Sequence, residues 1–380
     1  MAAARAAGAA EAWAGAARMA AWRAHSYAAD DAGAAAALRL DAARRPVRRA
    51  PAELLVRVHA SSINPIDLAM IRGYGSRVLN AWRALEGSEG LEFPLTPGRD
   101  FVGTVAGAAP GAALTPGERV WGVLPPHRVG AHAEYVLAKD SWVSKAPENL
   151  DDLEAGGALY GGLTACAALR AAGLAPGGAG EGGRRVLLLG LGGVGHAAAQ
   201  LLVRDTHHVV VSCASEQAEA AQALGAEPLD RRQEGYAESL AQAGPFDVVI
   251  DCAGQGGAGA ALLPCAFGVY VTLTSPLLRQ TDASGILPGT VAAAADLIQQ
   301  NLAVRQPAQI ASLSAWLPRV RWAFFSPRAD DIALLRRRAS RGHFTVCVER
   351  AWGWRHAGDA YARAARGHAR GKLMIDFTAP

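Results

Sequence analysis

A glycine-rich turn at residues 190–195 constrains the fold of this chain more than any other feature. The turn reads G-L-G-G-V-G and lies between an apolar run, residues 185–190, and a helical pattern, residues 195–204. In that context the G-x-G-x-x-G spacing allows a tight turn and close approach to a pyrophosphate, which the N-terminus of the helix faces. We therefore predict a dinucleotide site, with these cofactor-binding residues: Gly190, Gly192, Gly193, Val194 and Gly195.

The sequence around this turn alternates continuous apolar runs with helical patterns. Apolar runs without polar alternation are typical of parallel strands that are buried on both faces. The expected strands are 185–190, 208–213, 246–251 and 268–273, and the expected helices are 152–172, 195–204 and 216–224. The predicted fold class is α/β, with a doubly wound Rossmann cofactor domain over residues 151–328.

The first part of the chain has a different pattern, in which short β-rich runs are separated by Gly and Pro turns. The expected strands are 19–27, 37–40, 53–60, 101–107, 119–123 and 133–137. This spacing predicts a compact, β-rich and mostly antiparallel domain over residues 19–150. Two more strands, expected near 344–348 and 372–377 around a helix, indicate that residues 329–380 return to this first domain.

Composition and charge argue against several other classes of protein. The net charge is only +4, and the short basic runs 44–49 and 336–341 carry no interleaved aromatic residues, so a solvated surface is favoured over a nucleic-acid partner. The uncharged stretch 252–278 is broken by Gly and Pro, so we expect no transmembrane segment there. The five Cys never form a C-x-x-C pair, which argues against a disulfide framework and a four-Cys zinc site.

The first 18 residues have the composition of a short mitochondrial presequence. They contain two Arg, a single acidic residue and many Ala, which fits a helical targeting segment. We therefore expect a mitochondrial protein. Translation from Met19 would instead leave a cytoplasmic protein, and this alternative stays open.

The strand after the glycine turn indicates which nicotinamide cofactor is bound. A free ribose 2′-hydroxyl usually meets an acid about 20 residues after the turn, but this strand ends as S-C-A-S at 212–215 and its first acid is Glu216. Ser215 can donate to a 2′-phosphate and Arg231 can pair with it, so NADPH is favoured over NADH. The alternatives stay open that Ser215 only caps the next helix and that Arg231 is only a surface charge.

Two polar segments of the first domain, 61–67 and 97–100, are where a catalytic metal would be sought. A catalytic zinc needs three converging Cys, His or Asp/Glu ligands, and these segments offer only Asp67 and Asp100. We therefore expect a site without metal. Hydride acceptance would then be assisted by hydrogen bonds and proton donors, which suits a quinone or an enone better than alcohol oxidation.

Several strings in this sequence carry a family resemblance. They are S-I-N-P-I-D at 62–67, R-G-Y-G at 72–75, F-P-L-T-P-G-R-D at 93–100, R-W-A-F-F at 321–325 and R-G-H-A-R-G-K at 366–372. With the domain order, they make the chain from Met19 onward resemble the zinc-free quinone oxidoreductases of the medium-chain dehydrogenase/reductase superfamily. The resemblance implies a GroES-like catalytic domain and a mitochondrial NADPH-dependent oxidoreductase connected with coenzyme Q (ubiquinone) metabolism. It also implies a quinone or enone substrate, a matrix or membrane-associated location and mitochondrial protein partners.

The resemblance also implies roles for particular residues. Asn64 and Tyr74 would line the substrate end, and Tyr74 or solvent would supply the proton. The alternatives are that Asn64 and Asp67 stabilise their turn, that Tyr74 is a packing residue, and that the last loop is merely ordered by its own side chains. The implied cofactor-binding residues are Tyr160 and Thr164 at the nicotinamide, with His368, Ala369 and Arg370 closing over the cofactor.

The chain departs from that branch at two points. The branch has the turn G-A-S-G-G-V-G, whereas this turn is one residue shorter and lacks the Ser, and Arg231 stands where the branch has a Tyr. Two other functions therefore stay open. One is an NADPH-binding partner or assembly protein with little turnover, and the other is a 2-enoyl thioester reductase with a long acyl channel.

Overall fold

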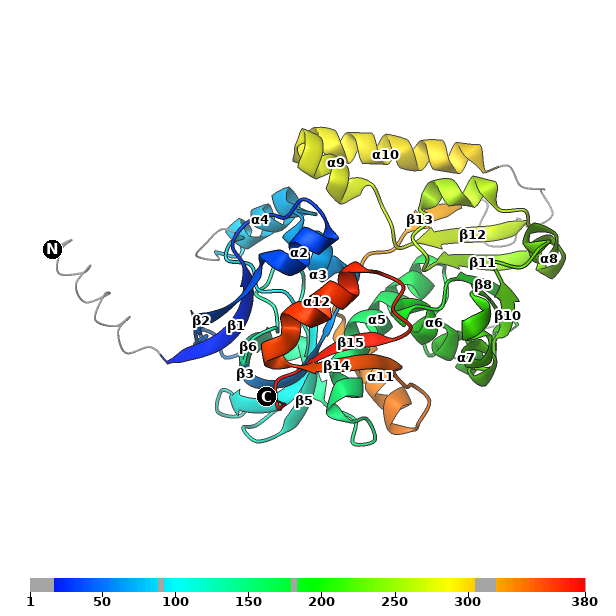
Figure 1. Cartoon of the computed structure of the whole chain (residues 1–380). Coiled ribbons are helices and arrows are strands. Elements are labelled where there is room, and N and C mark those ends of the chain that lie inside the picture. Colours follow the sequence, from blue (N-terminus) through cyan, green and yellow to red (C-terminus); the bar gives the residue numbers. More distant parts are fainter. Residues whose placement is uncertain (1–16, 88–91, 179–182, 305–318, 380) are drawn as a thin grey trace.

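The computed structural model describes residues 17–87, 92–178, 183–304 and 319–379. These residues form three sheets: one of two strands, one of six and one of seven. In Figure 1 the six-stranded and seven-stranded sheets lie on opposite sides of the molecule, with helix α5 (Asp152–Ala171) between them. The presequence interpretation falls almost entirely on residues 1–16, which lie outside the described residues.

The six-stranded sheet confirms the predicted doubly wound architecture. Its order is β10-β9-β8-β11-β12-β13 and every neighbouring pair is parallel. The chain moves from β8 to β9 on one side and later to β11 on the other, and in sheets of this kind ligands bind at the carboxyl ends of the strands where the order reverses. The strands are β8 Arg185–Leu189, β9 His208–Cys213, β10 Glu227–Asp230, β11 Phe246–Asp251, β12 Phe267–Thr272 and β13 Val320–Trp322.

Helices cover both faces of this sheet. Alternate residues of β8 belong to different apolar clusters, with Val186 and Leu188 in one and Leu187 and Leu189 in the other. This is why the strand sequence shows no polar alternation. The helices that follow the strands are α6 Gly193–Arg204, α7 Ala218–Ala223, α8 Tyr236–Ala243, α9 Leu277–Ser284 and α10 Ile286–Ala303, with 3₁₀ turns η2 Ser215–Gln217 and η3 Gly257–Leu262.

The seven-stranded sheet is mostly antiparallel, and both ends of the chain contribute to it. Strand β15 pairs with β3 through Leu373 and Ile63, so the C-terminal segment adds to the first domain's sheet. Only the β14–β15 pair is parallel among the strand pairs described in this sheet. The strands are β3 Glu53–Ile63, β4 Asp100–Gly107, β5 Arg119–Val123, β6 Tyr135–Lys139, β7 Val143–Lys145, β14 Val348–Gly353 and β15 Lys372–Asp376. The exact domain boundaries stay a prediction.

One expected strand was wrong. Residues 344–347 are irregular, and the strand begins only at Val348. Phe344 is nevertheless buried, because its ring packs against α5 beside Gly162. In the sequence, a buried apolar residue in a loop cannot be told from a buried apolar residue in a strand.

Smaller elements complete the first domain. Strands β1 (Arg18–Ala24) and β2 (Leu38–Arg44) form the two-stranded sheet. The helices are α2 Asp31–Ala37, α3 Pro65–Ile71, α4 Ser76–Leu85, α11 Ala329–Ser340 and α12 Ala357–Ala365, with 3₁₀ turns η1 Asp140–Trp142 and η5 Trp354–His356. None of the helices in the described parts of the chain is long and apolar enough to cross a membrane.

Helix α5 joins the two domains through small residues. A β-carbon on Gly156 would lie 2.8 Å from the Ala60 carbonyl oxygen of β3, and one on Gly161 would lie 3.2 Å from that of Gly193. Larger residues would push the helix away from either domain. The glycines therefore fix the distance between the first-domain strands and the glycine turn.

A buried histidine orders the end of β3 next to the candidate site. His132 is fully buried; its Nε2 lies 3.2 Å from the Ser62 carbonyl oxygen and its Nδ1 lies 3.0 Å from the hydroxyl of Tyr361. Burial lowers the pKa of His132 to about 3. The neutral ring therefore donates from Nε2 to the carbonyl and accepts at Nδ1 from Tyr361.

We expect His132 to make stability depend on pH. Its pKa falls from an ordinary 6.5 to about 3 on folding, so below pH 6.5 the unfolded chain binds more protons and the folded state loses stability. In urea unfolding at pH 7 and pH 5, the native protein should lose about 2 kcal/mol more over this interval than a His132→Gln variant. Equal losses in the two proteins would contradict this assignment.

Candidate active site

The glycine turn has the geometry of a cofactor cradle. Gly190 has a φ of +97°, and a β-carbon on Gly195 would overlap the Gly190 carbonyl oxygen, so both positions require glycine. A β-carbon on Gly192, in contrast, would meet no described atom within 4 Å. Helix α6 starts at Gly193, and the side chain of Val194 packs into the core. Open space before a helix N-terminus fits a cofactor pyrophosphate.

Ser215 and Arg231 lie at neighbouring strand ends. Ser215 begins η2 two residues after β9, and Arg231 directly follows β10. The N–H of Arg231 donates to the Cys213 carbonyl oxygen at 2.9 Å. Both side chains are exposed at the edge where the adenosine end of a dinucleotide would lie.

The same edge contains a charge cluster that the sequence did not lead us to expect. Arg232 Nη1 lies 3.2 Å from Glu216 Oε1, and Arg370 Nη2 lies 4.0 Å from the same oxygen. Arg370 therefore reaches from the C-terminal loop to the cofactor domain. Arg232 was not predicted to take part in this cluster, although it directly follows Arg231 after the end of β10.

The other two residues of the C-terminal loop are placed differently. His368 is exposed and has a left-handed φ of +51°. Ala369 packs against the apolar cluster of the first domain that includes Ile63 and Leu68. Among these three loop residues, the structure thus brings Arg370 to the cofactor domain, whereas Ala369 contacts the first-domain core.

Asn64 lies at the start of α3 and is almost completely buried. The Asp67 side chain accepts from its backbone, since Oδ2 lies 2.8 Å from the donating Asn64 N–H, and the Asp67 N–H donates to the Asn64 backbone carbonyl oxygen at 2.9 Å. The Asn64 side chain also contacts Asp100 and Lys372: Nδ2 donates to Asp100 Oδ1 at 3.0 Å, and Oδ1 accepts from Lys372 Nζ at 2.7 Å. Asp100 and Lys372 were not predicted as site residues, although each lies in a motif that carried the family resemblance.

Two tyrosines flank this network. Burial raises the pKa of Tyr74, which Arg279 opposes and Asp282 reinforces. Burial also raises the pKa of Tyr160, and the negative charges of Asp67 and Asp100 raise it further. The ring of Tyr160 stacks on Phe325 at 4.6 Å between centroids. Both tyrosines therefore keep their protons at neutral pH.

Thr164 lies one helical turn beyond Tyr160 on α5. It is buried, and its hydroxyl donates to the Tyr160 carbonyl oxygen at 2.7 Å. This bond keeps the hydroxyl at the helix backbone. Thr164 thus presents a compact surface beside Tyr160, at the end where the nicotinamide is expected.

The two carboxylates that a metal would need are already engaged. Both oxygens of Asp67 accept backbone N–H groups, and Arg99 Nε lies 3.4 Å from Oδ1. Asp100 lies 3.7 Å from the ammonium of Lys372. Within the described residues, no three His, Cys, Asp or Glu side chains gather in a way that could hold a metal ion. The donor set of the described residues therefore does not fit a catalytic zinc.

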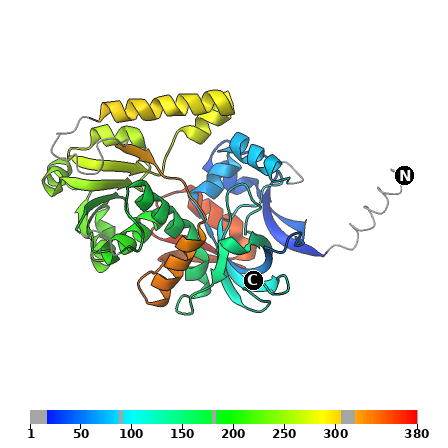
Figure 2. The same ribbon diagram turned by 180° about the vertical axis from the view of Figure 1, so that it is seen from behind.

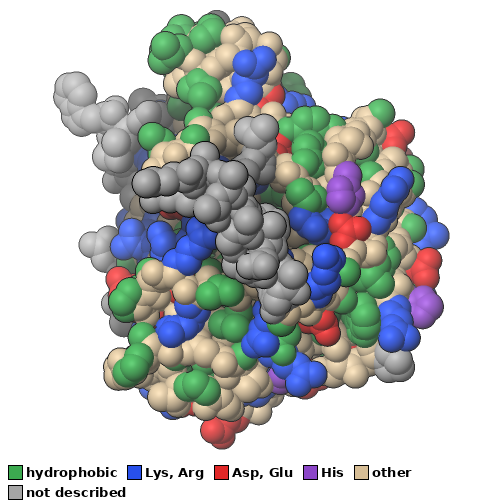
Figure 3. Space-filling model, turned by 90° about the vertical axis from the view of Figure 1, so that its left-hand side faces the viewer, with side chains coloured by type: hydrophobic (Ala, Val, Ile, Leu, Met, Phe, Trp, Pro, Cys, Tyr) green, Lys and Arg blue, Asp and Glu red, His purple; other side chains and the backbone are tan. Residues whose placement is uncertain are grey.

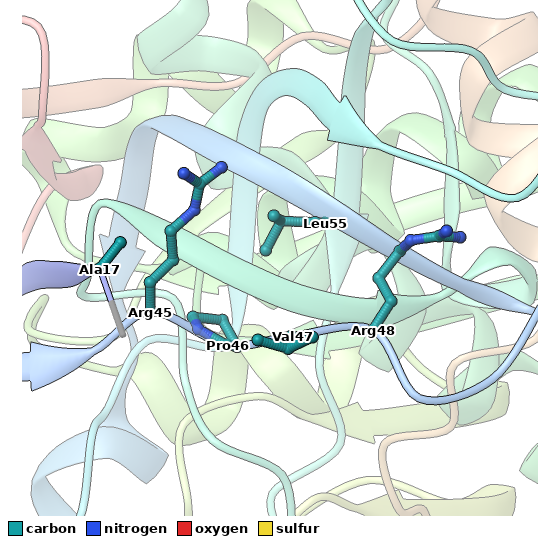
Figure 4. A pocket seen from close by; sticks show the side chains of 6 residues that line it. All are labelled: Ala17, Arg45, Pro46, Val47, Arg48 and Leu55. Carbon is teal, nitrogen blue, oxygen red and sulfur yellow. The ribbon is translucent and has the colours of Figure 1, made fainter. Parts of the chain in front are cut away.

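A shallow pocket of about 400 Å³ lies elsewhere, on the first domain. Figure 4 shows Arg45 and Arg48 on either side of Leu55, and the remaining lining residues are Ala17, Pro46 and Val47. None of the expected site residues lines it. On the face shown in Figure 3, basic side chains are interspersed with acidic, neutral and apolar ones.

Comparisons with known proteins agree with this architecture. Residues 50–148 match the alcohol dehydrogenase GroES-like domain, and residues 224–375 match the zinc-binding dehydrogenase family. A quinone oxidoreductase structure from Coxiella burnetii has the same fold, with a TM-score of 0.70, 23% identity and coverage of 95% of this chain and 99% of that one. Fold and site together define a medium-chain dehydrogenase/reductase.

Sequence relatives narrow this class. The mitochondrial NAD(P)H oxidoreductase RTN4IP1 of Drosophila melanogaster is 39% identical over 340 residues, which cover 87% of this chain and 80% of the relative. The chloroplast envelope quinone oxidoreductase homolog of Arabidopsis thaliana is 26% identical over 329 residues, covering 85% and 89%. The chain belongs to the RTN4IP1 family of NAD(P)H oxidoreductases, and it is an NAD(P)H-dependent enzyme.

We expect Gly192→Ala to impair cofactor binding without impairing folding. The new methyl group meets no described atom but occupies the space before α6, so the Kd for NADPH should rise by about tenfold or more. Calorimetry would measure Kd, and thermal unfolding should give a nearly native Tm. The control is Gly107→Ala, whose β-carbon would make an ordinary 3.7 Å contact with Leu55. A native Kd for Gly192→Ala would contradict this assignment of the pyrophosphate site.

The carboxylate of Asp282 on α9 ties the two domains together beside Tyr74. It accepts from the N–H groups of Gly75, at 2.6 Å, and Arg77, at 3.1 Å, at the start of α4. Arg77 Nε donates back to the Asp282 carbonyl oxygen at 2.9 Å. In Figure 1 and Figure 2, α9 and α10 lie along one edge of the molecule, and α9 reaches α4.

We expect Asp282→Ala to release the start of α4. Without their acceptor, the amides of Gly75 and Arg77 should exchange hydrogen about tenfold faster or more, as measured by hydrogen exchange. Asp359→Ala is the control, because this α12 carboxylate is 74% exposed and should leave those amides unchanged. Native exchange rates in Asp282→Ala would show that other contacts hold the two domains together there.

Proposed function

We propose that this enzyme uses NADPH to reduce a quinone or an activated alkene in mitochondria, without a metal ion. The observation that carries the proposal is the charge pattern at the substrate end. Arg99 and Lys372 neutralise Asp67 and Asp100, and two protonated tyrosines lie beside them. Such a site assists hydride acceptance through hydrogen bonds, which suits an electron-poor acceptor.

The cofactor residues divide into three groups. The backbone of residues 190–195 binds the pyrophosphate at the start of α6. Ser215, Arg231 and Arg370 hold the 2′-phosphate end, with His368 and Ala369 in the covering loop, while Tyr160 and Thr164 flank the nicotinamide. Bound NADPH supplies the hydride. The two charged arginines give the preference for NADPH over NADH.

Tyr74 holds the proton that the acceptor requires. Burial raises its pKa, so Oη keeps its proton at neutral pH and can donate a hydrogen bond to an acceptor oxygen. Asp282, on the neighbouring helix, favours the protonated form further. Asn64, which caps α3, completes the substrate end next to the tyrosines.

The relatives support the location and substrate class. Several carry mitochondrial in their names, which agrees with the Arg-containing and Ala-rich residues 1–18. The Arabidopsis relative is named as a quinone oxidoreductase homolog. We further propose a matrix or membrane-associated role in ubiquinone metabolism, with mitochondrial protein partners, and a catalytic domain formed by residues 19–150 and 329–380 beside the cofactor domain.

A panel of acceptors tests the proposal. NADPH oxidation should be fastest with quinones or enones, and Tyr74→Phe should lower kcat by about 100-fold with little change in the Kd for NADPH, because only the proton donor is lost. Tyr135→Phe is the control, since Tyr135 lies on β6 and contacts Arg45 instead.

Two other outcomes would replace the proposal. A clear preference for enoyl thioesters would make the protein a 2-enoyl thioester reductase. Tight NADPH binding without turnover of any acceptor would indicate a binding or assembly role.

A further inference from the structure

The side chain of Lys372 reaches from the last strand of the first domain towards the glycine turn of the second. Lys372 begins β15 and is only 8% exposed. A β-carbon on Gly157 of α5 would lie 3.2 Å from its Cε, and one on Gly193 of α6 would lie 3.6 Å from its Cδ. The stem of Lys372 therefore lies between the helix that joins the domains and the helix that faces the cofactor.

The ammonium of Lys372 lies in a buried polar network. Nζ donates to Asn64 Oδ1 at 2.7 Å and lies 3.7 Å from Asp100 Oδ2. Asp100 is fully buried and accepts from Asn64 Nδ2 at 3.0 Å and from the N–H of Tyr160 at 3.1 Å. The ion pair between Lys372 and Asp100 therefore contacts both Asn64 of the first domain and the backbone of Tyr160 on α5.

These partners allow the Asn64 carboxamide a single orientation. An ammonium can only donate and a carboxylate can only accept, so Oδ1 must face Lys372 and Nδ2 must face Asp100. Nδ2 also donates to Ser62 Oγ at 3.1 Å. Since both hydrogens are used, Asn64 can offer a bound ligand only the remaining lone pair of Oδ1.

We propose that Lys372 is a positioning residue for hydride transfer. Its ammonium fixes the orientation of the Asn64 carboxamide and, through Asp100, the α5 backbone at Tyr160. Both residues are thereby in place before cofactor and acceptor bind, which is how a preformed site avoids reorganisation during the reaction. The proposal rests on the proposed function, because it gives Lys372 a role in that reaction.

Two single variants separate charge from packing. Lys372→Met keeps the unbranched stem and removes the charge, whereas Lys372→Arg keeps the charge. For Lys372→Met we expect kcat with the preferred acceptor to fall by about 100-fold, since small displacements at a reacting centre are this costly. The Kd for NADPH should stay nearly native, the Tyr160 amide should exchange hydrogen faster, and Lys372→Arg should recover part of kcat.

A double variant separates position from stability. Lys372→Met leaves the Asp100 carboxylate buried without its cation, and adding Asp100→Asn removes that charge, so Tm should return towards the native value. We expect kcat to stay low, because the Asn64 carboxamide is still released. Recovery of kcat together with Tm would overturn the proposal and make Lys372 merely structural.

The remaining outcomes are also decisive. A large rise in the Kd for NADPH with an unchanged kcat would overturn the proposal and make Lys372 a ligand of the cofactor phosphates. Hydrogen exchange needs no turnover, so a native protein without activity would count against the proposed function alone. Unchanged exchange at Tyr160 in Lys372→Met would count against the positioning role.

Discussion

The ion pair between Asp100 and Lys372 lies where the two domains meet, and the geometry of the site depends on it. Asp100 begins β4 and Lys372 begins β15, and these strands flank β3 on either side. The carboxylate also accepts from Ser62 and from the N–H of Tyr160, so it orders the end of β3 and the middle of α5 together. Removal of one partner from such a buried pair typically costs about 3–5 kcal/mol, because the other charge is left in a medium that solvates it poorly.

Close packing at glycine positions allows the side chain of Lys372 to extend from the first domain to the second. Lys372 belongs to the first domain, and its stem passes close to α5 at Gly157, where a β-carbon would lie only 3.2 Å from its Cε, on the way to α6. The same absence of side chains brings α5 against β3 at Gly156. The glycines allow the two domains to approach closely. The buried ion pair then fixes how the first domain and α5 are placed relative to one another. The proposed nicotinamide and substrate ends of the site lie at this contact between the domains.

Local patterns in the sequence were sufficient for the central strands and the glycine turn of the cofactor domain, but not for all of its elements or for the buried polar network at the site. The runs that form β8, β9 and β11 are apolar throughout because both faces are buried, and the glycine turn carries its own geometry. Helix α10 was missed, since its exposed face carries Leu287, Val291, Ile298 and Leu302 and shows no amphipathic contrast. Lys372 and Asn64 are 308 residues apart, and no local pattern records that their side chains meet. Conversely, a strand was predicted at Phe344 because the sequence shows that this residue is apolar, but not that it is buried from a loop.

The positive charges at the proposed substrate end come from buried side chains of the protein. Arg99 is fully buried beside Asp67, and its guanidinium donates to backbone carbonyl oxygens of four residues, namely Thr96, Pro125, Pro126 and Arg128. The guanidinium is held in this position, because moving it would leave the carbonyl groups and the Asp67 carboxylate buried without partners. Burial raises the pKa of Asp67, and Arg99 opposes that effect together with the Asn64 and Gly98 N–H groups that donate to the carboxylate. In the proposed reaction, these fixed cations and protonated tyrosines would polarise an acceptor through charge and hydrogen bonds, which suits a substrate that accepts hydride readily.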